Sequence, residues 1–227
     1  MHMEPGIVEG SKILLSHATA ATALVLGVSH VRDAIRQAGV LPLAIRSMVA
    51  SVLVFLFFEV FPHVAVGISE VHLILGTTLL LLFGVAPAAI GLMLGLLSQG
   101  LLFAPADLPQ YGMNVTTLLL PLFATHAIAQ RIIPANTAYV DIGYAQAFKL
   151  SLAYQGGIVL WVGFWAIYGN GIGAENMAQV TTFGLAYMTV VLIEPLIDLA
   201  VLAGARMFRG RLASSLLHHR LHAPLAE

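Results

Sequence analysis

Charged side chains are scarce in this chain. Asp, Glu, Lys and Arg together make up 9% of its 227 residues, and hydrophobic residues make up 59%. A soluble domain carries about 25% charged residues. This composition excludes an ordinary water-soluble globule and predicts an all-α, polytopic transmembrane helical bundle surrounded by the lipid bilayer. The formal net charge of −1 gives no reason to expect nucleic acid as a partner.

Cysteine is absent altogether. This absence excludes disulfide bonds, zinc sites with cysteine ligands and iron–sulfur clusters. The sequence also contains no Walker lysine motif, no nucleophile–base pair and no metalloprotease helix. We therefore do not expect an enzyme, and no motif points to ATP hydrolysis or to an organic cofactor.

The N-terminus lacks the positive charges of a signal peptide. Its first residues include Glu4, Glu9 and Lys12, so the basic n-region is missing. We expect the terminus to be mature as written, with Met1 retained because His2 is not a small residue. A free α-amine would then lie beside the His2 imidazole.

Six apolar runs stand out, at about residues 13–30, 43–61, 72–104, 113–133, 149–169 and 181–205. The third covers 33 residues, and one straight helix of that length would measure about 50 Å against a hydrocarbon core of about 30 Å. Gly84 and Pro87 interrupt this run, and proline removes a helical hydrogen bond and restricts the residue before it. The sequence therefore predicts a turn at 84–87 between two shorter helices, and seven spans in all.

The basic residues indicate an orientation. With seven spans, nine of the ten Lys and Arg residues lie on or next to one side of the membrane, and only Lys12 lies on the other. Because Lys and Arg concentrate in cytoplasmic loops, we expect the N-terminus outside and the C-terminus inside. The outer loops 1–12, 62–71, 105–112 and 170–180 are then acidic, which favours cations. The nine are Arg32, Arg36, Arg46, Arg131, Lys149, Arg206, Arg209, Arg211 and Arg220.

Met1 and His2 form the first candidate site. The terminal amine, the His2 backbone nitrogen and the His2 Nδ1 atom can close fused five- and six-membered rings on one metal ion. Because the amide nitrogen must lose its proton, a strongly polarising metal is needed. Copper(II) and nickel(II) accept such a square-planar nitrogen set, cobalt(II) is more permissive, and zinc prefers tetrahedral surroundings. The alternative is an exposed terminal histidine without a role.

This chelate leaves a position for one further ligand at the same depth. His72 begins the third apolar run at its outer end and is the best placed histidine. His63 lies in the same outer loop, where it either binds metal or caps the loop. His17 and His126 lie inside spans, where a histidine is more often hydrogen-bonded than metal-binding, although intramembrane ionisable groups are rare and usually functional.

Four other polar residues lie within or beside the apolar runs. Asn114 begins the fifth span and either orients His72 or serves the helix backbone. Gln99 lies near the outer end of the fourth span and either serves the site or bonds a neighbouring helix. Glu194 and Asp198 stand four apart on the last span, around Pro195. We expect a structural or partner-contact role for this pair rather than a proton path.

Several of these segments resemble the CbiM/NikM family, the substrate-binding membrane subunits of energy-coupling-factor transporters for cobalt and nickel. The start MHMEPG resembles that family's MH-x-x-(E/D)-G, and GISEVHLILG around His72 resembles its Gly-rich S-G-H-L segment. QGLLF at Gln99 resembles Q-A-L-L-F, and YGMN at Asn114 resembles L-G-A-N. Order and spacing agree over residues 1–120, and the rest agrees only in hydropathy. The sequence departs from the family at three places. Pro5 interrupts the usual opening, Glu70 and Val71 stand where the family usually has glycines, and the usual second asparagine after Asn114 is missing.

The resemblance implies a metal site made by Met1, His2 and His72, with Glu70 adding an oxygen ligand or a hydrogen-bond acceptor for His72. Ni²⁺ or Co²⁺ would be the transported substrate. The implied partners are a transmembrane coupling subunit, two cytoplasmic ATPases and, in some members, a small accessory membrane subunit. The implied location is the bacterial or archaeal cell membrane.

The expected organisation has three parts: a metal-chelating segment at 1–12, the helical bundle at 13–208 and a cytoplasmic basic tail at 209–227. The tail is either solvated or laid on the inner membrane surface or a partner. Two other functions stay open at this point. One is a membrane metal sensor or assembly protein, and the other is a membrane metalloenzyme whose histidines bind haem iron or a hydrolytic metal.

Overall fold

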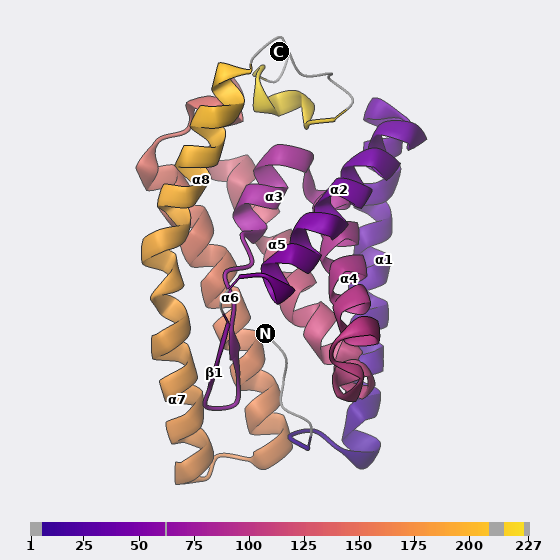
Figure 1. The fold of residues 1–227 in the computed structure, drawn as a ribbon, viewed down its shortest axis with the longest axis vertical. Coiled ribbons are helices and arrows are strands. Elements are labelled where there is room, and N and C mark those ends of the chain that lie inside the picture. Colours follow the sequence, from indigo (N-terminus) through magenta and orange to yellow (C-terminus); the bar gives the residue numbers. More distant parts are fainter. Residues whose placement is uncertain (1–5, 62, 209–215, 225–227) are drawn as a thin grey trace.

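The computed structural model describes residues 6–61, 63–208 and 216–224, and it is a bundle of long helices with one small hairpin (Figure 1). The expected all-α, polytopic bundle is confirmed. The helices are α1 (Ile13–Ala38), α2 (Val40–Glu59), α3 (Gly76–Phe83), α4 (Val85–Leu102), α5 (Tyr111–Ile132), α6 (Tyr144–Asn170), α7 (Ala174–Met188) and α8 (Val190–Met207). Two short strands, β1 (Val64–Val66) and β2 (Ser69–Val71), form the hairpin, and 3-10 turns lie at Gly10–Lys12, Pro105–Gln110, Tyr139–Asp141 and His219–Leu221.

The described residues contain six helical stretches that are long and apolar enough to cross a membrane, rather than the seven expected. The predicted break is present, because Gly84 has a φ of +92° and separates α3 from α4. Pro87 then lies in the first turn of α4, where the missing N–H group costs no helical bond. However, α3 has only eight residues and measures about 12 Å. It is too short to span a bilayer alone, so the seven-span count stays a prediction.

The course of the chain gives the bundle two distinct ends (Figure 1). We call the end where α1 begins and α6 turns into α7 the lower end, and the end where α8 finishes the upper end. Arg209 and Arg211 lie outside the described residues. Of the other Lys and Arg residues, only Lys12 lies at the lower end, where its Nζ atom donates to the Tyr168 and Gly169 carbonyl oxygens at 3.1 and 2.9 Å. The remaining basic residues lie on or near the upper end.

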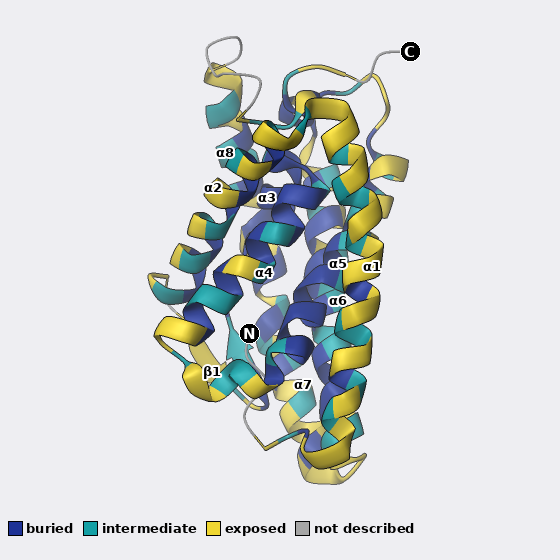
Figure 2. Ribbon diagram, turned by 90° about the vertical axis from the view of Figure 1, so that its right-hand side faces the viewer, coloured by how far each residue is buried: buried dark blue, intermediate teal, exposed yellow. Residues whose placement is uncertain are grey.

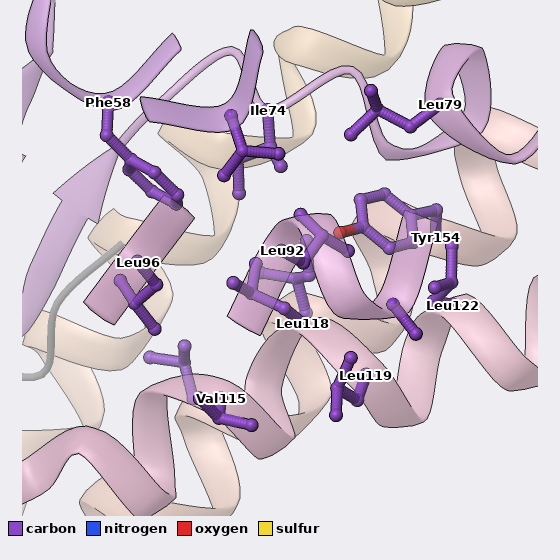
Figure 3. Packing of buried hydrophobic residues seen from close by; sticks show 14 of the residues in the cluster. Phe58, Ile74, Leu79, Leu92, Leu96, Val115, Leu118, Leu119, Leu122 and Tyr154 are labelled. Atoms are coloured by element: carbon purple, nitrogen blue, oxygen red, sulfur yellow. The ribbon is translucent and has the colours of Figure 1, made fainter. Parts of the chain in front are cut away.

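Small residues allow the closest helix contact. A Cβ atom at Gly91 of α4 would lie 2.5 Å from Ala50 Cβ of α2, and one at Gly95 would lie 2.6 Å from Val54 Cγ1. This four-residue spacing of glycines is the pattern that lets membrane helices approach closely. Around it, leucine, isoleucine and aromatic side chains from α2, α3, α4, α5 and α6 form one packed core (Figure 3).

The outward faces of the helices are apolar as well. Leu14 and Val25 of α1, Leu160 of α6 and Leu192 of α8 are all more than half exposed, and exposed residues cover the outer sides of the bundle (Figure 2). In water the hydrophobic effect would oppose the exposure of such an apolar surface, whereas lipid tails solvate it. The structure therefore agrees with a multi-pass membrane protein.

Residues 216–224 of the C-terminal segment pack on the upper end of the bundle. The His218 backbone N–H donates to the Leu82 carbonyl oxygen at 2.7 Å. The Arg220 guanidinium lies 4.9 Å from the centre of the Tyr139 ring and donates to three backbone carbonyls of the α5–α6 connection. Leu221 is fully buried. This part of the expected tail is therefore anchored to the protein rather than extended into solvent.

Candidate functional site

The hairpin between α2 and α3 positions two histidines. Its register pairs Val64 with Val71 and Val66 with Ser69, so His63 and His72, the next residues outward, lie opposite each other. Gly67 makes the turn with a φ of +63°, and a Cβ atom there would lie 2.5 Å from the Gln179 carbonyl oxygen of α7. Only glycine fits both the backbone conformation and this close approach.

His72 is held from several sides and is only 2% exposed. Its Nε2 atom lies 2.9 Å from Glu70 Oε2. The His63 ring stacks on it with centroids 5.0 Å apart, and the Phe58 ring meets it edge-on at 5.1 Å. Because a carboxylate can only accept, the Nε2 proton is directed at Glu70, the arrangement that carboxylates commonly impose on metal-binding histidines.

Gln99 of α4 and Asn114 of α5 form a second polar group. Both side chains are buried, and both line a small cavity of about 10 Å³ together with Asp107 and Tyr111. The Tyr111 hydroxyl donates to the Met93 carbonyl oxygen at 2.8 Å. The apolar neighbour Leu96 lies between Phe58 and Val115 (Figure 3), and Phe58 in turn contacts His72, so this pair adjoins the packing around His72.

Met1 and His2 lie outside the described residues, and their proposed role as ligands stays a prediction. The chain that follows them is packed into the bundle. Val8 is 1% exposed, Ile7 packs against the main core, and the Ile7 carbonyl oxygen lies against Gly169 of α6 where a Cβ atom would clash. Residues 7 and 8 of the N-terminal segment therefore lie against the core.

Among the described residues, no three His, Asp or Glu side chains converge closely enough to hold a metal ion. The predicted ligand set takes two of its three members from the first two residues, so His72 is the one ligand of that set that the structure places. His63 and Glu70 lie beside it as described above. His17 is exposed on α1, and His126 lies far from this group, towards the upper end of α5.

Glu194 and Asp198 of α8 are both fully buried, which argues against the contact with a partner protein that was considered for them. Ser151 Oγ and Gln155 Nε2 of α6 donate to Glu194 Oε2 at 2.6 and 2.7 Å, and Thr78 of α3 donates to Asp198 Oδ1. The two carboxyl groups therefore join three helices inside the core. Sequence reasoning missed their partners, since Thr78, Ser151 and Gln155 lie 39 or more residues away along the chain.

These features define a class of protein: a helical membrane bundle with an apolar core, several buried polar side chains and a buried histidine in contact with a carboxylate. The family model for CbiM, the cobalt uptake substrate-specific transmembrane region, matches residues 2–212. The chain belongs to this family, and it is a membrane component of cobalt uptake. The resemblance found over residues 1–120 is thus confirmed and extends over nearly the whole chain. The searches of curated proteins and of solved structures found no match.

Proposed function

We propose that this chain is the substrate-binding membrane subunit of an energy-coupling-factor transporter that takes up a divalent transition metal, cobalt or nickel. The observation that supports it most directly is His72, a nearly inaccessible imidazole whose Nε2 atom is fixed on Glu70. Imidazole nitrogen suits nickel and other divalent metals of the first transition row better than it suits calcium or magnesium. Burying an ionisable side chain in a membrane bundle costs free energy, and such residues are rare and usually functional.

The proposed ligands are the Met1 amine, the His2 backbone and imidazole nitrogens, and His72. The burial of Val8 and the packing of Ile7 on α6 support a path in which the N-terminal segment closes over the metal. Glu70 holds the His72 ring, and Gln99 and Asn114 supply nearby polar groups. A nitrogen-only set that includes a deprotonated amide favours nickel, whereas cobalt, the metal of the family description, accepts a wider range of geometries.

The remaining parts of the transporter would come from other chains. No ATPase motif is present in the sequence, so uptake needs cytoplasmic ATPases and a transmembrane coupling subunit, with a small accessory membrane subunit in addition where the system has one. The excess of basic residues at the upper end supports a cytoplasmic position for that end in the bacterial or archaeal cell membrane. The lower end would then face the side from which metal arrives.

The test is metal binding by purified, untagged protein in detergent. Titration with Ni²⁺ and with Co²⁺ should show one tight equivalent for the preferred ion. His2→Ala and His72→Ala should each abolish it, and a Gly-Ser extension before Met1 should abolish it as well. His17→Ala, at an exposed histidine of α1, is the matched control and should bind like the parent. Tight binding that survives both the extension and His72→Ala would overturn the proposal.

A further inference from the structure

A cavity of about 700 Å³ opens at the upper end of the bundle, on the opposite end from the hairpin. Its walls come from α1, α2, α5, the break between α3 and α4, and the packed C-terminal segment. Four of its lining residues are histidines: His30, His126, His218 and His219. The proposed metal chelate does not use any of them.

Most polar groups of this cavity fall into two sets, and the buried Arg46 of α2 also lines it. His218, His219 and Arg220 belong to the C-terminal segment, and Arg220 is occupied by the carbonyl oxygens of Ile133, Pro134 and Thr137. The other set lies on the helix wall, where His30 and Asp33 of α1 face His126 and Gln130 of α5. Asp33 stands one turn from His30 on the same helix face, and its carboxylate lies 3.9 Å from the Arg36 guanidinium, which offsets part of the negative charge near the two imidazoles.

The two wall histidines are spaced for a shared metal ion. Their ring centroids are 5.3 Å apart. With a metal–nitrogen bond of about 2.1 Å, a ligated ring has its centre about 3.2 Å from the metal, so two rings at a tetrahedral angle lie about 5 Å apart. Metal binding would therefore need rotation of the side chains and no shift of α1 against α5. The Phe123 ring packs on His30 at 5.1 Å and supports its position.

One nitrogen of this pair already acts as an acceptor. The Nε2 atom of His126 lies 3.1 Å from the Gln130 Nε2 atom, and an amide NH₂ group can only donate. The His126 Nε2 atom therefore carries a lone pair that points towards Gln130, which lines the same cavity. A metal ion would replace the Gln130 amide at this atom, as the carbonyl end of the same side chain turns to face the ion.

We propose that His30 and His126 form a second, weaker site for a divalent transition metal ion on the wall of the upper cavity. Two imidazoles supply the protein ligands, water fills the other positions and Asp33 supplies a nearby negative charge. Fewer protein ligands make this site weaker than a closed chelate, and an ion on a transport path must bind weakly enough to leave again. Metal binding at this site is independent of the proposed function. Its role as a transient site for the transported ion as it leaves the protein rests on the proposed function.

The experiment is a Ni²⁺ titration of the metal-stripped, untagged full-length protein, read by calorimetry and by equilibrium dialysis. The parent protein should bind a tight and a weak class of Ni²⁺. His30→Ala and His126→Ala should each lose the weak class and keep the tight one. His72→Ala should lose the tight class and keep the weak one. His17→Ala should keep both classes, and a monodisperse elution profile with the thermal midpoint of the parent establishes folding for each variant.

The double variant His218→Ala/His219→Ala separates the wall pair from the histidines of the C-terminal segment, and its weak class should be unchanged. A weak class that persists in His126→Ala, or one that disappears in the His218/His219 variant instead, overturns the wall site. Absence of any weak class in the parent also overturns it. If the parent and every variant lack the tight class but the parent shows the weak one, the proposed chelate is overturned and the wall site is still supported.

Discussion

The His72 imidazole lies 2.9 Å from the carboxylate of Glu70, two residues earlier in the chain. Alternate residues along an extended segment share one face, so this contact follows directly from the strand that carries Glu70. Glu70 occupies a position where the segment that resembles the CbiM/NikM family usually has glycine. The departure therefore places a hydrogen-bonding carboxylate against the one predicted ligand that the structure describes.

Glu70→Gln should weaken the tight metal binding by about 10- to 100-fold, the usual effect of losing a partner that orients a metal-binding histidine. The amide cannot stabilise the polarised imidazole as a carboxylate does, and it can turn its NH₂ group towards the ring. Calorimetric titration with Ni²⁺ or Co²⁺ measures the change. Glu175→Gln, at an exposed carboxylate of α7, is the matched control. Equal affinities in the two variants would contradict an orienting role for Glu70.

The hairpin that builds this contact is the main feature the sequence analysis missed. Residues 72–83 continue an apolar run into α4, and hydropathy alone cannot distinguish a strand or an extended segment from a helix in such a run. The alternation in VAVGISEV, centred on Gly67, is the signal that was available. It is the pattern of a short hairpin with a glycine turn, and it would have placed His63 opposite His72.

The break at Gly84 was predictable because glycine and proline act locally on the backbone. The partners of Glu194 and Asp198 were not, since they depend on how α3 and α6 pack against α8. The histidines of the upper cavity were also unpredictable, because they come from α1, α5 and the C-terminal segment. Hydropathy and the positions of glycine and proline thus predict the helices, whereas contacts between polar groups on different helices can be found only from the structure.

Gly169→Ala should weaken metal binding without unfolding the bundle. The Ile7 carbonyl oxygen lies where the new methyl group would be, so the N-terminal segment must move away from α6. If that segment carries the chelate, binding should fall and the thermal midpoint should change little. Gly156→Ala lies on the same helix with no neighbouring atom within 4 Å of its Cβ position, and it should bind metal like the parent. Unchanged binding in Gly169→Ala would show that metal binding does not depend on the packing of Ile7 against α6.

Glu194→Leu should destabilise the protein, whereas Glu194→Gln should be tolerated. Leucine removes the acceptor of Ser151 Oγ and Gln155 Nε2, and each buried donor left unsatisfied costs about 1–3 kcal/mol. The glutamine carbonyl oxygen can still accept these bonds. Thermal unfolding in detergent, followed by circular dichroism, should show a clear fall in the midpoint for Leu and a small change for Gln. Equal midpoints for the two variants would show that these hydrogen bonds do not stabilise the bundle.

Acid should release the C-terminal segment from the upper end. Burial, followed by the nearby His219, Arg46, His126 and Arg220, lowers the pKa of His218 to about 3. Its Nδ1 atom also accepts from the Arg220 backbone N–H at 3.3 Å, which only the unprotonated ring can do. In a released segment the pKa would return to about 6.5.

Above pH 6.5 the ring is neutral in both states, and packing of the segment is at full strength. As the pH falls below 6.5, the released form takes up a proton that the packed form does not, so packing weakens by up to about 1.4 kcal/mol per pH unit until the lower pKa is reached. Hydrogen exchange of residues 216–224 should therefore rise between pH 7.5 and pH 5, after correction for the intrinsic rate. His218→Gln should remove this dependence, and His17→Gln should keep it. A segment whose corrected exchange is flat with pH in the parent protein would show that His218 does not control its packing.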